Sequence, residues 1–274
     1  MDRAYDIEDL KRLMERLRDP AHGCPWDLKQ TYQSIAPFTL EECLELIDAL
    51  EQSDYEHVEE ELGDLLFQVI FYAQLGKEEG RFDFDSVVSG ITAKLLRRHP
   101  HVFKDGQLEG VIEDRTSMAA IKVNWEKTKA EERADRSQTS IMDDVPATLG
   151  ALSRAQKLQK RAATVGFDFS SASDVSARLL DEYRELEQAI ASADQNEIEN
   201  ELGDVLFTVV NAARHLKVDS EAALRKANRR FETRIRSAES DAAAEGTSLM
   251  EESAERLDER WQNAKLKEKN KHGL

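Results

Sequence analysis

The segment Glu61-Leu-Gly-Asp-Leu-Leu-Phe67 returns later in the chain as Glu201-Leu-Gly-Asp-Val-Leu-Phe207, with six of seven residues identical at an offset of 140. From each copy onward, apolar residues recur at steps of three and four. They occupy positions 62, 65, 66, 69, 70 and 73, and again 202, 205, 206, 209, 210 and 213. This spacing is typical of an amphipathic helix. The chain therefore contains one helical unit twice.

The sequence around each copy predicts further helices. An acidic helix is expected before each copy, over 39–50 and 180–190, and a basic helix after it. With only 5 Pro and 12 Gly in 274 residues, the chain has few of the turn residues that many short strands need. We therefore expect an all-α protein. Its two tandem helical domains would span residues 1–130 and 147–274, joined by a polar linker over 131–146.

The composition limits the partners and the compartment of the protein. A formal net charge of −17 at pH 7 would repel a polyanion, so nucleic acid is not an expected partner. The two cysteines, Cys24 and Cys43, do not suggest a disulfide framework. The N-terminal sequence does not resemble a signal peptide, and no apolar run approaches the roughly 20 residues that cross a bilayer. We expect a cytoplasmic protein without a membrane partner.

Four acidic residues share one spacing in the two halves. In each half a Glu-x-x-Glu pair is followed, sixteen residues later, by a Glu-x-x-Asp pair. Residues three apart lie on one face of a helix, so two antiparallel helices can bring four carboxylates together. Oxygen ligands without His or Cys suit Mg²⁺ or Mn²⁺. The metal-ligand candidates are Glu42, Glu45, Glu61 and Asp64 in the first half, and Glu182, Glu185, Glu201 and Asp204 in the second.

A structural role is the main alternative for these carboxylates. Thr39-x-x-Glu42 has the form of a capping box, in which the glutamate bonds back to the start of the helix. The second half has Leu179 in place of Thr39 and still carries Glu182, so capping does not account for both copies. We therefore favour the metal-site interpretation.

Each repeated helix also contains a glycine, Gly63 or Gly203. A glycine inside a helix costs about 1 kcal/mol relative to alanine. The expected compensation is a close approach by another stretch of backbone or by a ligand.

A basic helix follows the carboxylates in each half. Its cations recur every four residues and therefore share one face. Such a stripe can hold phosphate groups, although a solvated face with intrahelical ion pairs is the alternative. The candidates are Lys94 and Arg98 in the first half, and Lys226, Asn228, Arg230 and Arg234 in the second. Trp125 and Trp261 close the two halves, and each indole could stack on a base or pack in the core.

With these motifs in view, the chain resembles the MazG family of nucleoside triphosphate pyrophosphohydrolases in its two-domain bacterial form. The resemblance covers nearly the whole chain, and motifs of this length in this order are highly specific. The matching segments are GCPWD (23–27), YQSIAPFTLEE (32–42), ELGDLLFQVIFYAQ (61–74), RRHPHVF (97–103), RAQKLQKRAATVGFDF (154–169) and ELGDVLF (201–207).

The resemblance implies that both carboxylate sets bind Mg²⁺ and that dimerisation completes an all-α bundle. It implies that diverse ribo- and deoxyribonucleoside triphosphates are the substrates. It also implies that the basic helix and a late tryptophan contact the triphosphate, here through Lys226, Asn228, Arg230, Arg234 and Trp261. Arg230 is a departure, because a lysine is expected there and arginine holds phosphate with a different geometry.

The expected reaction is hydrolysis of a nucleoside triphosphate to the monophosphate and pyrophosphate. A metal-activated water would attack the α-phosphorus while the metal and the basic stripe neutralise the departing pyrophosphate. Because the second half has the longer stripe, we expect it to carry most of the activity. The catalytic candidates are Glu182, Glu185, Glu201 and Asp204.

Two other functions are compatible with a helical protein rich in carboxylates. A non-catalytic helical module would only bind or regulate a partner protein, and the sequence itself names no such partner. A ferritin-like di-iron protein would need Glu-x-x-His ligands. None of the six histidines has a glutamate three residues before it, so the di-iron alternative is close to excluded.

Overall fold

The computed structural model describes residues 4–109, 117, 121, 125 and 140–272. It divides the chain into two compact units, residues 1–131 and 132–274, which are treated separately below. Within the described residues every regular element is a helix, as expected for an all-α fold. None of these helices is both long and apolar enough to cross a membrane. The predicted linker over 131–146 lies outside the described residues as far as residue 139.

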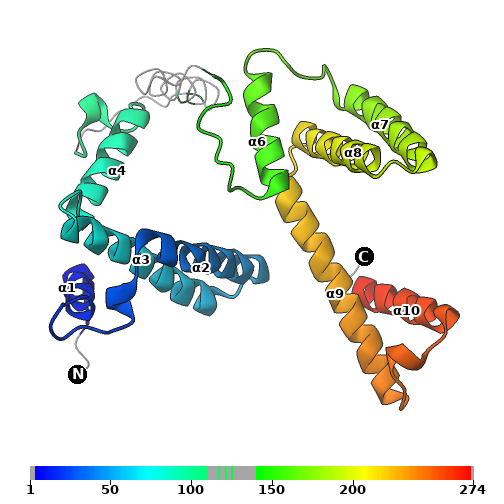
Figure 1. Cartoon of the computed structure of the whole chain (residues 1–274), viewed down its shortest axis with the longest axis horizontal. Helices are drawn as coiled ribbons and strands as arrows, with labels where there is room; N and C mark the ends of the chain where they lie inside the picture. Colours follow the sequence, from blue (N-terminus) through cyan, green and yellow to red (C-terminus); the bar gives the residue numbers. More distant parts are fainter. Residues whose placement is uncertain (1–3, 110–116, 118–120, 122–124, 126–139, 273–274) are drawn as a thin grey trace. The chain divides into compact units, whose positions relative to one another are not determined.

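The first unit is built around a long antiparallel hairpin of two helices, with one helix before it and one after it (Figure 1). Short 3₁₀ turns precede the hairpin and follow the last helix. The elements are α1 (Ile7–Leu17), η1 (Asp27–Lys29), α2 (Tyr32–Gln52), α3 (Tyr55–Glu78), α4 (Phe84–Arg98) and η2 (Lys104–Gly106).

The start of α2 corrects one alternative raised by the sequence. The N-cap is Thr31, whose Oγ1 accepts a hydrogen bond from the Ser34 amide at 3.2 Å, while the Ser34 Oγ accepts one from the Thr31 amide at 2.8 Å. Thr39 lies inside the helix, where its hydroxyl donates to the carbonyl of Ile35 at 3.2 Å. The capping-box explanation of Glu42 is therefore wrong, because the helix starts elsewhere.

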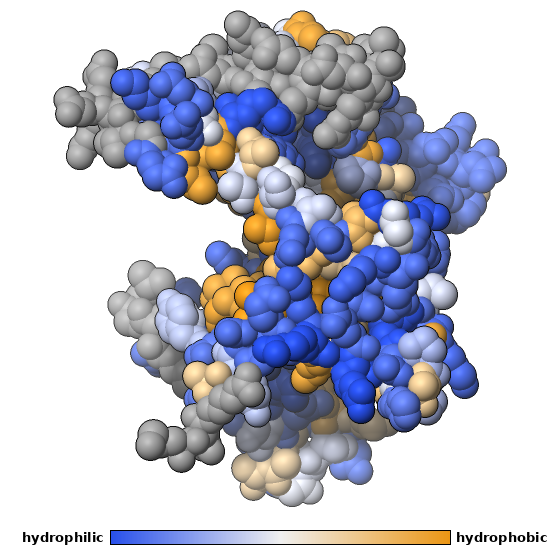
Figure 2. Space-filling view, turned by 90° about the vertical axis from the view of Figure 1, so that its left-hand side faces the viewer, coloured by the Kyte–Doolittle hydropathy of each residue, from blue (hydrophilic) through white to orange (hydrophobic). Residues whose placement is uncertain are grey.

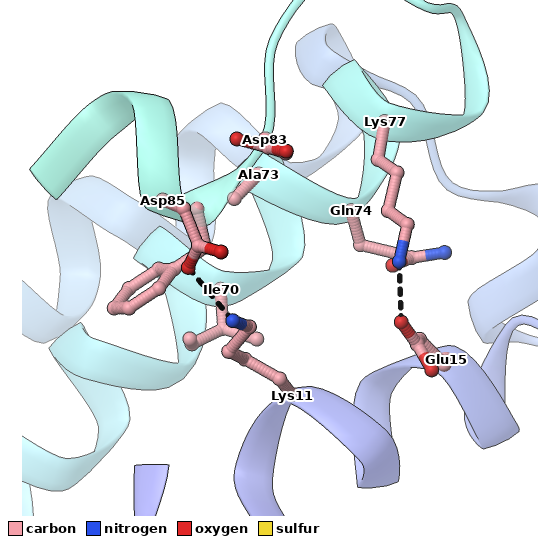
Figure 3. Close-up of a pocket in the computed structure, with 9 residues that line it drawn as sticks. Lys11, Glu15, Ile70, Ala73, Gln74, Lys77, Asp83 and Asp85 are labelled. Atoms are coloured by element: carbon pink, nitrogen blue, oxygen red, sulfur yellow. Dashed lines mark hydrogen bonds and ion pairs between the residues drawn. The ribbon is translucent and has the colours of Figure 1, made fainter. Parts of the chain in front are cut away.

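The core of the first unit lies where α1 packs against the α2–α3 hairpin. Its buried members come from all three helices, and they are Met14, Ile35, Ile70, Phe71 and Leu75. Ion pairs at the edge of this core connect α1 to its neighbours: Lys11 Nζ lies 2.8 Å from Asp85 of α4, and Lys77 Nζ of α3 lies 2.6 Å from Glu15 (Figure 3).

The second unit repeats the hairpin and adds a longer helical arm. Its elements are α6 (Ala151–Ala163), α7 (Ala172–Ser192), α8 (Gln195–His215), α9 (Ser220–Ala244), η3 (Leu249–Glu251) and α10 (Ala254–His272). The helices α7 and α8 form the hairpin, and α6 packs against α8. Figure 1 shows α9 leaving the end of α8 and α10 lying along the far part of α9, away from α7.

Both hairpins turn by the same device. The C-cap residue that follows the first helix adopts left-handed backbone geometry, with φ of 60° at Ser53 and 57° at Ala193. The next residue is an aspartate that caps the second helix: Asp54 accepts from the amide of residue 57, and Asp194 from those of residues 196 and 197. This tight reversal makes the helices antiparallel and faces the two acidic pairs toward each other.

Candidate metal centres

The first-half centre forms between α2 and α3. One carboxylate oxygen from each of Glu42, Glu45 and Glu61 lies within 4.8 Å of the others. Glu61 is buried, and its Oε1 lies 2.9 Å from His57 Nε2 one turn earlier on α3. Asp64, the fourth candidate, is exposed and lies outside this group of three. The hairpin therefore brings three of the four predicted ligands into range of a single ion.

The second-half centre forms between α7 and α8, from a different set of three. Glu182, Glu201 and Asp204 each offer an oxygen within 4.8 Å of the others. Glu185 lies outside this group and contacts Arg178, whose Nη1 is 3.4 Å from Glu185 Oε1. The same arginine holds buried Glu182, with 2.7 Å between Arg178 Nε and Glu182 Oε1.

Both centres have the properties of a cation site. Glu61, Glu182 and Glu201 each have a buried Oε2 without a hydrogen-bond partner in the described part of the chain. A buried carboxylate oxygen without a partner is costly unless a cation or donor satisfies it. Burial and then the charge of neighbouring carboxylates raise the pKa of Glu42 and of Glu201, as expected where like charges converge. The donor sets, all oxygen, fit Mg²⁺ or Mn²⁺.

The two helix-interior glycines do not meet any other part of the described chain. A Cβ built at Gly63 or at Gly203 would have no neighbouring heavy atom within 4 Å, outside its own helix backbone and chain neighbours. The expected approach of a backbone stretch is therefore wrong within the described chain. Both glycines are exposed, and each directly precedes the aspartate of its carboxylate set.

The basic stripe of the second half lies on α9. Lys226, Asn228 and Arg230 are exposed along this helix. Arg234 is partly buried, because its Nε lies 2.7 Å from Glu268 and its guanidinium lies over the ring of Trp261 at 5.2 Å. Within one chain, α10 and the far part of α9 are separated from α7 in Figure 1. The hairpin carboxylates are therefore not joined to Arg234 and Trp261 in a single copy.

The first half contains a shorter version of the same arm. Helix α4 starts at Phe84 and α9 at Ser220, so the two align at an offset of 136. At this offset the pair Arg98 and Trp125 corresponds to Arg234 and Trp261, and Arg98 also lies over its indole, at 5.5 Å. Lys94 corresponds to Arg230, but Gly90 stands in the place of Lys226. The first stripe thus lacks one cation.

The sequence interpretation missed two features of the second half. Arg178 was not a candidate, although its position four residues before Glu182 places both on one helix face. A cavity of about 550 Å³ adjoins Glu182 and Arg178, and it was not expected either. Comparing the two halves residue by residue would have indicated Arg178, because the first half carries Phe38 in its place.

Comparison with known proteins agrees with this geometry. The family model of the MazG nucleotide pyrophosphohydrolase domain matches residues 30–103 and again 170–237. The chain is 47% identical to the nucleoside triphosphate pyrophosphohydrolase of Escherichia coli (strain K12) over 264 residues, which cover 96% of this chain and 98% of that protein. It is 40% identical to the nucleoside triphosphate pyrophosphohydrolase/pyrophosphatase MazG of Thermotoga maritima over 259 residues, 94% of this chain and 95% of that protein. Both matched ranges contain one complete carboxylate set.

Proposed function

The chain belongs to the MazG family of nucleotide pyrophosphohydrolases, and we propose that its second half carries most of the hydrolysis of nucleoside triphosphates to a monophosphate and pyrophosphate. The observation that carries this proposal is the convergence of Glu182, Glu201 and Asp204, with two buried oxygens left unpartnered. Because this centre has the fuller basic arm, it is the better equipped of the two to hold a triphosphate.

The carboxylates would hold the divalent cation and accept the proton of the attacking water. Glu182, Glu201 and Asp204 supply the convergent oxygens, and Glu185 lies one turn beyond Glu182. When bound, Mg²⁺ or Mn²⁺ supplies positive charge to the phosphates and lowers the pKa of an attacking water. A carboxylate oxygen not engaged by the cation would accept the proton of that water as it attacks the α-phosphorus. The first-half set, Glu42, Glu45, Glu61 and Asp64, would bind the same kind of ion.

Fixed cations would hold the triphosphate and stabilise the pyrophosphate that leaves. Lys226, Arg230 and Arg234 present three positive charges along α9, with Asn228 between them. Arg178 adds a fourth beside the carboxylates, and its bond to Glu182 keeps it in place. The Trp261 ring, with Arg234 on one face, offers an aromatic surface to the nucleotide. Lys94 and Arg98 would play a weaker, parallel part in the first half.

A homodimer would bring these cations to the carboxylates. In one copy the far part of α9 and α10 lie apart from the hairpin (Figure 1). Large apolar side chains also remain exposed on both hairpins, including Leu40 at 61% and its counterpart Leu180 at 59%, and Figure 2 shows apolar patches at the surface. Apolar surface of this kind favours association. We infer that a second copy covers it and contributes its basic arm.

Light scattering tests the dimer with a matched pair of variants. Leu180→Asp, on the hairpin, should convert a dimer to a monomer and reduce turnover, whereas Tyr5→Asp should change neither, because Tyr5 is 82% exposed and lies outside the hairpins and the basic arms. A wild-type protein that is monomeric at full activity would contradict this assembly.

The two cysteines support a cytoplasmic location. Cys24 and Cys43 are both free and partly buried. Free thiols are usual in a reducing compartment, so we place the protein in the cytoplasm.

Product analysis tests the reaction itself. Purified protein incubated with ATP and Mg²⁺ should release AMP and pyrophosphate, the products of attack at the α-phosphorus. Release of ADP and phosphate would overturn the position of attack. No product across a panel of nucleoside triphosphates and metals would overturn the enzyme and favour the non-catalytic helical module.

A further inference from the structure

One cation of the α9 stripe is held in place by residues around it. Lys226 and Arg230 are exposed, whereas the side chain of Arg234 is 22% exposed. Its Nε donates to Glu268 Oε2 at 2.7 Å, and its guanidinium lies 5.2 Å from the centroid of the Trp261 ring. Both partners lie on α10, which runs along the far part of α9 (Figure 1). Arg234 is therefore the point at which the stripe meets α10.

Glu268 and Trp261 constrain the guanidinium of Arg234 in two different ways. They are seven residues apart, about two turns, and so lie on the same face of α10. The indole supports one face of the guanidinium, and the carboxylate binds one edge of it through Nε. Arg234 makes no other hydrogen bond within the described residues, so both of its Nη groups remain as donors. A planar group that presents two amino groups in a fixed direction is well suited to phosphate.

A second arginine of the same two helices provides a contrast. Arg260 is 3% exposed, and two carboxylates bind it on both edges. Glu252 accepts from its Nε and Nη2, and Glu245 accepts from its Nη1 and Nη2. This arginine joins the end of α9 to the start of α10 and has no edge left for a ligand. Arg234 is bound on one edge only, as expected for a cation that must still receive one.

The position of the Glu268 carboxylate also argues against simple competition with phosphate. A competing carboxylate would occupy the Nη groups that a phosphate needs, whereas Glu268 binds only Nε. The pair is partly shielded from water, at 22% and 21% exposure, so solvent screens it less than a fully exposed pair. An arginine that is already ordered loses less conformational entropy when it binds a ligand.

We propose that Glu268 is a positioning residue for the triphosphate, which orients Arg234 so that its two Nη groups bind a phosphate group. The inference rests on the proposed function, because the role of Arg234 as a phosphate ligand comes from it. Glu268 itself carries a negative charge and acts only through Arg234. It extends the phosphate-binding machinery from the stripe on α9 to a residue on α10.

The test uses the full-length, Mg²⁺-loaded protein and two readouts. These are the KM for ATP and the Kd, by calorimetry, for α,β-methylene-ATP, whose P–C–P link resists release of pyrophosphate. Glu268→Ala should raise both constants about fivefold, because Arg234 loses its orientation. Glu268→Gln keeps an acceptor for Nε and should stay within about twofold of wild type.

Two further variants separate positioning from support of the helix. Lys267→Ala removes the ion pair with Asp241, at 2.6 Å, which joins the same two helices, and it should leave both constants unchanged. In an Arg234→Ala background, Glu268→Ala should have no further effect on either constant, since the residue through which it acts is gone.

The outcomes separate this inference from the proposed function. A wild-type protein that neither releases pyrophosphate nor binds the analogue would reject the function and this inference with it. If the wild type is active, unchanged constants for Glu268→Ala would reject the inference alone, and lower constants would mean that the carboxylate competes with phosphate. An increase that persists without Arg234, or that Lys267→Ala or Glu268→Gln reproduces, would also reject orientation of Arg234 by this bond.

Discussion

The two halves share one arrangement of helices and differ in the side chains around their carboxylates. Both carry a capped helical hairpin, a convergent carboxylate set and an arginine lying over a tryptophan. The first half packs Phe71 into its core and has Gly90 on its arm, whereas the second has Asn211 and Lys226 at those places. The comparison teaches that carboxylate convergence comes with the hairpin, while the capacity to hold a nucleotide depends on the residues around it.

Removing the metal should have the largest effect. Chelation should reduce turnover about 1000-fold or more, since a metal ion supplies several kcal/mol of charge stabilisation, and added Mg²⁺ should restore it. Calorimetric titration with Mg²⁺ separates the two carboxylate sets, because Glu201→Gln should lose turnover yet still bind Mg²⁺ at the first-half carboxylates. Turnover that persists without divalent metal would remove the basis for treating either set as a metal centre.

The difference between the arms predicts a smaller, selective effect. Lys226→Ala should raise the KM for ATP about tenfold or more, because a charge-assisted hydrogen bond to phosphate is worth about 1.5–3 kcal/mol. Lys94→Ala, on the shorter arm, should change KM less than about twofold. Steady-state kinetics of the two variants measure this directly. Equal increases in KM would mean that both arms hold substrate.

The effect of acid on stability should differ least between the halves, because in each half an arginine–carboxylate pair connects the hairpin to the segment before it. The arginine lies on the preceding segment in the first half and on the hairpin in the second. In the first half, a bond from Arg18 lowers the pKa of Glu78. In the second, burial opposes the shift, but bonds from Arg214 and His215 lower the pKa of Asp168 overall. A carboxyl with a lowered folded-state pKa stabilises the protein above its unfolded pKa, and this stability is lost as the pH falls through the folded value.

Glu78→Gln and Asp168→Asn should each therefore lower the free energy of unfolding by about 1 kcal/mol at pH 7, after allowance for partial exposure. The difference from wild type should shrink toward zero below about pH 4, the region of ordinary carboxyl pKa values. Denaturant titrations at a series of pH values measure it. A difference that stays constant with pH would mean that the pairs contribute through packing alone.

Much of this architecture could be predicted from the sequence because it depends on periodicity. The repeat, the hairpins and the approach of the acidic pairs follow from apolar spacing along the helices. The choice of ligands within each set could not be predicted, because it depends on side-chain neighbours. Arg178 engages Glu185 in the second half, whereas the equivalent position in the first is Phe38.

Two other features depend on packing across elements. Residues of α6, α7 and α8 line the cavity together, among them Gln159 and Asn211, and single-helix patterns do not report such a gap. The separation of α10, which carries Trp261, from the hairpin depends on the direction in which α9 leaves α8 (Figure 1). The Thr39 capping box failed for a related reason, since Thr31 provides a cap farther upstream.

The most direct test of the division of labour is the rate of pyrophosphate release from ATP and Mg²⁺ by two matched full-length variants, Glu61→Gln and Glu201→Gln. These residues occupy equivalent positions in the repeat. Because we assign most of the activity to the second-half centre, we expect this rate to fall at least about 100-fold for Glu201→Gln and to change less than about threefold for Glu61→Gln. Equal losses, or a loss confined to Glu61→Gln, would contradict it.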